Sequence, residues 1–203
     1  MSENGLTALM KRIIDSDYTS MDELLKESDK YSIDEIRGFL DHIIMKWEAY
    51  KLTPAAMNAL LKFVYLFIDQ PDIQIRFKNQ TPFPICYFSS FLLPSASFLY
   101  SYLKTLSFAV RLFSLDKTER HLKESIEQQN PPAVLLTISQ FLHVDAMAQL
   151  VPYLHTRNLT IIIGGIPFVY DQSLKRAFSD CLFPQDVTEL VPLLENSMRG
   201  DQR

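Results

Sequence analysis

Residues 133–165 read AVLLTISQFLHVDAMAQLVPYLHTRNLTIIIGG, and this stretch decides the fold. It opens with a short apolar run, Ala133–Ile138, and closes with another, Leu159–Ile163. Runs of this length that are rich in apolar residues are typical of buried strands. Between them, the apolar residues of Val144–Arg157 recur at helical spacing. A buried strand, a helix and a second buried strand predict two parallel strands joined by a crossover helix.

The same alternation continues on both sides of this stretch, from Pro82 to the C-terminus. Further apolar runs predict strands at Phe83–Phe88, Phe108–Phe113 and Cys181–Phe183. Helical spacing predicts further helices at Ser95–Leu106, Lys117–Gln129, Asp171–Ser179 and Gln185–Met198. Alternation of strand and helix five times over indicates an α/β fold, in which helices cover both faces of a parallel sheet. We therefore predict, at residues 82–203, a five-stranded doubly wound sheet of the flavodoxin- or Rossmann-like type.

Residues 1–70 have helical periodicity throughout and predict an N-terminal four-helix bundle. The expected helix starts are Leu6 of Leu6–Ile14, Met21 after the capping box Ser20-x-x-Glu23, Ile33 after the capping box Ser32-x-x-Glu35, and Pro54 after the N-cap Thr53. Residues 71–81 form the predicted linker. Within it, Ile73, Ile75 and Phe77 alternate and are candidates for packing on the sheet edge.

Charge and composition exclude several classes of protein. The net charge is -4 and no Lys/Arg run occurs, so we expect no direct nucleic-acid binding. No apolar stretch has the length of a membrane span, and the N-terminus lacks a signal-peptide core. The two cysteines, Cys86 and Cys181, lie inside apolar runs and predict buried free thiols in a reducing cytosol. The expected location is therefore cytoplasmic.

Small and hydroxyl-bearing residues end two of the predicted strands. Thr137 and Ser139 end the third, and Gly164-Gly165 ends the fourth. In open α/β sheets ligands bind at this carboxyl edge, and glycine allows a ligand to approach the backbone closely. A bulky side chain at Gly165 is accordingly expected to block a ligand there without unfolding the domain.

A helical bundle followed by such a β/α domain resembles the cobalamin-binding module of methionine synthase, corrinoid methyltransfer proteins and light-sensing cobalamin-dependent repressors. The resemblance covers nearly the whole chain. It implies a cofactor site in which Thr137, Ser139, Gly164 and Gly165 line the nucleotide tail of cobalamin. It further places Trp47 over the corrin, and Ser89 and Ser90 in the loop below it.

The chain departs from this family at the residues that hold the metal. Family members carry Asp-x-His-x-x-Gly after the first strand, whereas residues 89–95 read SSFLLPS, with Leu92 near the histidine position. Leucine cannot coordinate cobalt. In the repressors a Glu-His pair follows the tryptophan, and at the matching positions after Trp47 this chain has Met57-Asn58. We therefore predict that cobalamin is not bound in the usual histidine-ligated way, and the cofactor stays open between none and a tetrapyrrole such as cobalamin or haem.

His143 follows the third predicted strand and leaves two interpretations open. The resemblance implies a possible axial role toward haem, since haem-binding variants of this domain exist. The other interpretation is a residue of a loop or helix start beside Asp145. Aromatic residues around the first strand and helix belong either to the core or to a cavity reshaped for a flatter apolar guest: Phe83, Tyr87, Phe88, Phe91, Phe98, Tyr100 and Tyr102.

The sequence has no nucleophile elbow, dinucleotide fingerprint or phosphate loop, and we expect no enzymatic activity. The leading prediction is a sensory or regulatory module that acts through a partner protein or through self-association, for example as a dimer. The alternatives are a corrinoid carrier of a methyltransferase system and a scaffold that binds no small molecule.

Overall fold

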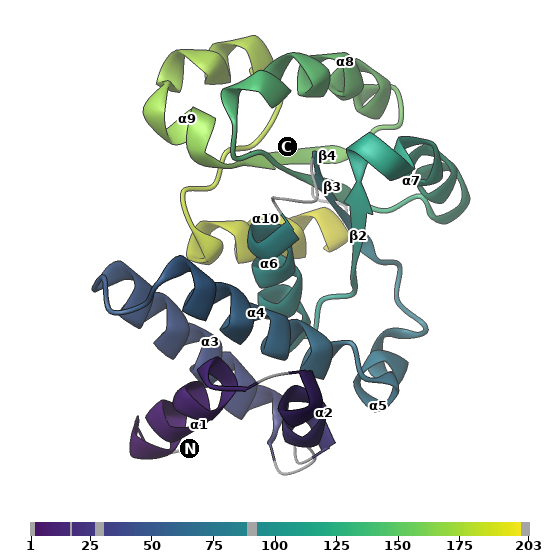
Figure 1. Ribbon diagram of the computed structural model, residues 1–203. Coiled ribbons are helices and arrows are strands. Elements are labelled where there is room, and N and C mark those ends of the chain that lie inside the picture. The colour runs from purple at the N-terminus through teal and green to yellow at the C-terminus, as the bar shows by residue number, and fades with distance from the viewer. Residues whose placement is uncertain (1–2, 17, 27–30, 89–92, 200–203) are drawn as a thin grey trace. The chain divides into compact units, whose positions relative to one another are not determined.

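The structure is a computed structural model that describes residues 3–16, 18–26, 31–88 and 93–199. Its contacts divide the chain into two compact units (Figure 1). One unit combines Met1–Gln80 with Ser97–Phe108, and the other combines Thr81–Ala96 with Ala109–Arg203. Each unit has its own core and is described by itself. No helix in the described part of the chain is both long and apolar enough to cross a membrane.

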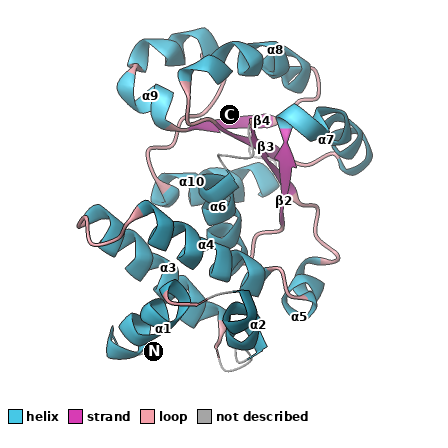
Figure 2. Ribbon diagram, in the orientation of Figure 1, coloured by secondary structure: helices cyan, strands magenta, loops and turns pink. Residues whose placement is uncertain are grey.

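A parallel four-stranded sheet organises the second unit and confirms the predicted α/β class (Figure 2). Its strands are β1 Phe83–Tyr87, β2 Val110–Ser114, β3 Ala133–Thr137 and β4 Thr160–Gly164. Their order is β2-β1-β3-β4, and every pair is parallel. All carboxyl ends therefore meet at one edge of the sheet.

The predicted fifth strand, Cys181–Phe183, is wrong as a strand. Only Leu182 pairs, through an isolated parallel bridge to Ile162. The Leu182 N–H donates to the Ile161 carbonyl at 2.9 Å, and the Leu182 carbonyl accepts from the Ile163 N–H at 2.8 Å. Pairing stops there because the Cys181 N–H donates to Phe178 in a turn, and Pro184 has no N–H.

The helices that follow the strands of this unit are α7 Leu115–Gln129, the 3-10 helix η4 Phe141–His143, α8 Val144–His155, α9 Ile166–Tyr170, the 3-10 helix η5 Gln172–Phe178 and α10 Val187–Arg199. Figure 1 shows α7 and α8 over one face of the sheet and α10 over the other. The helix predicted at Asp171–Ser179 is present as the 3-10 helix η5, whereas the preceding helix α9 was not predicted. The Asp171 carboxylate accepts from the Ser173 N–H at 2.9 Å and so caps a new 3-10 helix after α9.

Alternate strand residues and two helices build the core on the α7 and α8 face. Leu136 and Ile163 of the sheet pack with Leu122 of α7 and Met147 of α8, and all four are buried. The strands read as continuous apolar runs because helices cover both faces of the sheet. Cys86 and Cys181 are free and buried, as predicted. Burial raises the pKa of both thiols, that of Cys181 to about 11, so both are protonated at neutral pH.

The ends of β3 and β4 meet at a close backbone contact. The Ile138 N–H donates to the Gly164 carbonyl at 3.1 Å. Gly165 has φ 126°, and a Cβ added to it would lie 1.7 Å from the Ile138 carbonyl oxygen. Gly164, by contrast, has open space where a Cβ would stand. Gly165 is therefore required by the fold, and the expectation that it tolerates a bulky side chain is wrong.

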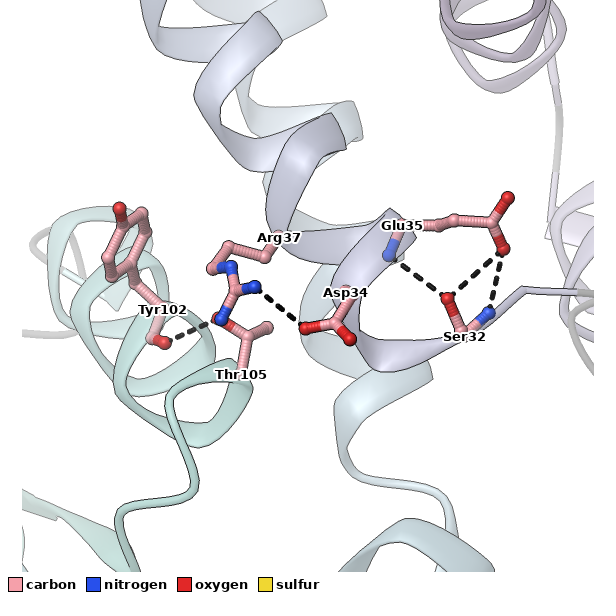
Figure 3. A network of polar contacts seen from close by, with 6 residues as sticks. All are labelled: Ser32, Asp34, Glu35, Arg37, Tyr102 and Thr105. Carbon is pink, nitrogen blue, oxygen red and sulfur yellow. Dashed lines mark hydrogen bonds and ion pairs between the residues drawn. The ribbon is translucent and has the colours of Figure 1, made fainter. Parts of the chain in front are cut away.

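The helical unit begins with α1 Glu3–Ile14, α2 Tyr18–Lys26, α3 Ile33–Glu48 and α4 Pro54–Ile68. The capping box of α3 is confirmed (Figure 3): the Glu35 N–H donates to Ser32 Oγ at 3.2 Å, and the Ser32 N–H donates to Glu35 Oε2 at 3.0 Å. This second bond lowers the pKa of Glu35. The Thr53 cap of α4 is also confirmed, by a 3.2 Å bond from the Ala56 N–H. The start predicted near Met21 is wrong, because α2 already begins at Tyr18.

Residues 71–81 contain the helical turns α5 Pro71–Gln74 and η2 Ile75–Phe77, which bury Ile73 and Phe77 and leave Ile75 68% exposed. The alternation of apolar residues in this segment thus belongs to helical turns, not to an extended chain.

A buried lysine joins these turns to α6 Leu93–Thr105. Lys104 is only 3% exposed, and its Nζ donates to Gln74 Oε1 at 2.9 Å and lies 3.8 Å from the centre of the Phe77 ring. Gln74 in turn donates to the Tyr100 hydroxyl at 2.9 Å. Burial lowers the pKa of Lys104 to about 8, while Asp69 acts in the opposite direction. These contacts place Ser97–Phe108 in the helical unit.

The close contact at Gly165 predicts a large difference between two neighbouring glycines. Gly165→Ala should lower the free energy of unfolding by about 1–3 kcal/mol or more, because alanine is strained at this φ and its Cβ meets the Ile138 carbonyl. Gly164→Ala, the matched control, should change it by less than about 1 kcal/mol. Urea denaturation measures both. Equal effects of the two substitutions would contradict the contact.

The depressed pKa of Lys104 contributes a stabilisation that grows with pH. Between about pH 8 and the ordinary lysine pKa of 10.5, the unfolded chain holds a proton that the folded chain has released. The buried thiols of Cys86 and Cys181 act in the opposite direction over the same range, because unfolded thiols ionise there, so the effect of Lys104 is measured as a difference between variants. Between about pH 7 and about pH 9.5, the urea midpoint of Lys104→Met should fall relative to that of the wild-type chain, and Lys78→Met, at an exposed position, should follow the wild type. An identical pH profile in Lys104→Met would rule the explanation out.

Candidate functional site

A pocket of about 340 Å³ opens at the carboxyl edge of the sheet. Its lining comes from the residue after β1 (Phe88), the start of α7 (Leu115 and Asp116), the turn before α8 (His143) and one side of α8 (Ala146, Gln149 and Leu150). Strand order places β1 and β3 side by side, and the chain leaves them toward opposite ends of the sheet. This is the topological switch point, where open α/β sheets bind their ligands.

His143 is the central polar residue of the pocket. Its ring stacks on Phe88 with centroids 5.3 Å apart and an angle of 17° between the planes. Its main-chain N–H donates to the Gln140 carbonyl at 3.2 Å, which holds the turn before α8. Its Nδ1 is buried and has no hydrogen-bond partner among the described residues. A buried nitrogen without a partner costs about 1–3 kcal/mol, so a ligand that pairs with Nδ1 removes this cost.

The other polar side chains of the pocket are Asp116 and Gln149. The Ser114 hydroxyl donates to the Asp116 carboxylate and fixes it at the start of α7. The residues lining the pocket include a carboxylate, an amide and an imidazole, and none is Lys or Arg. A phosphate would meet the negative charge of Asp116 without a cation to offset it. The arrangement therefore favours a neutral or cationic ligand with hydrogen-bond donors.

The sequence-predicted site residues fall into separate places. Thr137 and Gly164 are register partners in β3 and β4, so they share the carboxyl edge. Ser139 lies two residues beyond β3 and is half-buried. Of the predicted residues that the structure describes, His143 alone lines the pocket. Gly165 serves the backbone contact with Ile138.

Ser89 and Ser90 lie outside the described residues. Trp47 belongs to α3 in the helical unit and is 40% exposed.

Sequence reasoning missed Asp116 and Gln149. Asp116 lies just beyond β2, at the same edge as Thr137, but the second strand was predicted two residues too early and its helix two residues too late. Ala146, Gln149 and Leu150 have the spacing of one helix face, yet only the packed structure tells which face lines the pocket.

Exposed apolar side chains continue along the carboxyl edge. Phe141 and Leu142 follow β3, and Ile166 and Val169 follow β4, with exposures of 50–71%. The pocket itself lies at the lower end of the size range of small-molecule sites, and within this unit it does not enclose a corrin or haem. No group of three metal-ligating side chains occurs in the part of the chain that is described. Taken alone, the described lining of this unit has the size for a group smaller than a tetrapyrrole.

Comparisons with known proteins show the fold. No family model matches the sequence, and no curated protein matches it. Among solved structures, the chain is similar to the 1.5 Å crystal structure of a novel cobalamin-binding protein from Desulfitobacterium hafniense DCB-2. The TM-score is 0.54 at 13% sequence identity, and the match covers 95% of this chain and 98% of the other. This chain therefore has the fold of a cobalamin-binding protein.

Proposed function

We propose that this chain is a non-enzymatic sensory or regulatory module that acts through a partner protein or through self-association. The observation that carries the proposal is the switch-point pocket, in which the buried Nδ1 of His143 lacks a partner among the described residues. A small ligand that pairs with this nitrogen alters the stability of the start of α8, and with it the surface that the module presents to its partner.

The chemistry of the pocket supports binding over catalysis. His143 stacks on Phe88, an arrangement that holds the ring in place. The carboxylate of Asp116 accepts a hydrogen bond from the Ser114 hydroxyl. The thiols of Cys86 and Cys181 have raised pKa values, so they are not nucleophiles at neutral pH.

A corrinoid carrier of a methyltransferase system is the alternative, and the fold likeness to a cobalamin-binding protein favours it. The sequence opposes it, because residues 89–95 contain no histidine and Leu92 stands near the required position. We therefore propose that cobalamin is not held in the usual histidine-ligated way.

A visible absorption spectrum separates these functions. The full chain is mixed with hydroxocobalamin or with hemin and then desalted. We expect no corrin absorbance to remain. A retained red corrin spectrum would support the carrier and overturn the proposal. A Soret band that His143→Ala abolishes would identify haem as the ligand of the sensor. A colourless chain whose self-association, measured by light scattering, changes in His143→Ala would support a regulatory pocket with another ligand.

His143 and Phe88 should differ in their contributions to stability. Phe88 is 8% exposed, and Phe88→Ala should cost about 3 kcal/mol because it leaves a cavity in the core. His143→Ala should cost less than about 1 kcal/mol, because no described residue pairs with its Nδ1. Urea denaturation compares them. If His143→Ala is as destabilising as Phe88→Ala, the histidine supports the fold and not a ligand.

A further inference from the structure

A second groove lies on the helical unit, between α1 and the chain that follows α3. Its volume is about 310 Å³. The apolar part of its lining is Met10, Ile14 and Leu52, and the charged part is Lys11, Lys46, Lys51 and Asp15. Met10 is nearly buried at 5% exposure, while Ile14 is 39% exposed, so the groove has an apolar floor that is open at one side.

Positive charge is concentrated at this groove. Three lysines face one carboxylate in the lining, whereas the whole chain carries a net charge of -4. None of the three lysines forms an ion pair with another described residue. Lys11 and Lys46 also lie in the last turns of α1 and α3, where a cation complements the helix dipole. Two helix ends at one groove therefore place lysines that pair with no described residue beside apolar side chains.

The turn that forms one wall of the groove contains a strained residue. The Tyr50 N–H donates to the Trp47 carbonyl at 2.9 Å, and the Lys51 N–H donates to the Lys46 carbonyl at 2.9 Å. This is the Schellman pattern, in which glycine is usual at the left-handed position. Tyr50 occupies that position with φ 55° and is 96% exposed.

The side chain of Tyr50 therefore adds little to the packing of the unit, while its backbone costs about 1 kcal/mol relative to glycine. Strained residues of this kind cluster at functional sites. An exposed tyrosine beside a groove is typical of a protein interface.

We propose that this groove, together with Tyr50, is the docking surface for an acidic amphipathic helical segment of a partner protein. An apolar side chain of the segment enters between Met10 and Leu52, and flanking Glu or Asp residues meet Lys11 and Lys51. The inference rests on the proposed function in one respect, that the module acts through a partner. An anionic membrane is the less suitable occupant, because the apolar floor is recessed: Met10 is 5% exposed, so it can receive a side chain but does not protrude into a bilayer.

The test uses a fluorescent peptide of about 18 residues, with Leu at positions i, i+3, i+4 and i+7 and Glu on the flanks. A control peptide has Gln in place of Glu. Fluorescence anisotropy with the full chain should show binding of the Glu peptide that weakens with added salt. The control peptide should bind at least about tenfold more weakly. Equal binding of the two peptides would overturn the proposal.

Matched variants locate the surface. Lys11→Gln with Lys51→Gln should weaken binding at least about tenfold, and Lys26→Gln with Lys78→Gln, two exposed lysines away from the groove, should not. Tyr50→Gly should raise the urea midpoint and yet weaken binding of the peptide. A purely structural role of Tyr50 does not produce this combination. Equal effects of the two lysine pairs would refute the site.

The other occupant and the proposed function are tested separately. If the chain instead sediments with phosphatidylcholine–phosphatidylglycerol vesicles and does not bind the peptide, the groove is a membrane-binding surface and the proposal fails. The spectra and the self-association of His143→Ala report on the switch-point pocket alone. A negative result in those experiments does not affect the docking proposal for the groove. Absence of peptide binding at the groove does not affect the proposed function of the pocket.

Discussion

The backbone of Gly165 passes against the carbonyl of Ile138, and the carboxyl edge of the sheet depends on this contact. The Ile138 N–H extends the pairing of β3 with β4 by one bond to the Gly164 carbonyl. With the two strand ends held together, the turn carrying His143 and the start of α9 emerge from one edge. Side chains that are distant in the sequence, such as Phe88 and His143, thereby come into contact. The pocket is a consequence of where these strands end.

The two units place opposite charge chemistry on their concave surfaces. The pocket of the β/α unit carries Asp116 and suits a neutral or cationic ligand. The groove of the helical unit carries Lys11, Lys46 and Lys51 and suits an acidic one. One molecule cannot satisfy both by charge. This difference favours a module that recognises a small ligand with one unit and a macromolecule with the other.

Burial, more than ion pairing, shifts the pKa values of the titrating groups inside the molecule. Lys104 is held by an amide and two aromatic rings, and Asp69 only partly offsets the loss of hydration. Burial also shifts the pKa of the Cys86 thiol, but upward, because the charged form of a thiol is the anion. By contrast, three ion pairs among the described residues lie at the surface: Arg37–Asp34 (Figure 3), Arg120–Glu124 and Arg157–Glu127. Such pairs contribute little stability.

The sequence by itself determined the class of the fold, because hydrophobic periodicity, helix caps and apolar strand segments are local features of the chain. The Ser32 and Thr53 caps and four of the five predicted strands could be inferred from neighbouring residues alone. Where local patterns compete, prediction failed, as for Ser20, whose spacing to Glu23 also fits the interior of a helix. Only the tertiary structure decided that Leu182 forms a bridge and not a strand, that Lys104 is buried, and that Asp116 shares a pocket with His143. These outcomes depend on which surfaces meet, and contacts between residues far apart in the chain leave no periodic signal in it.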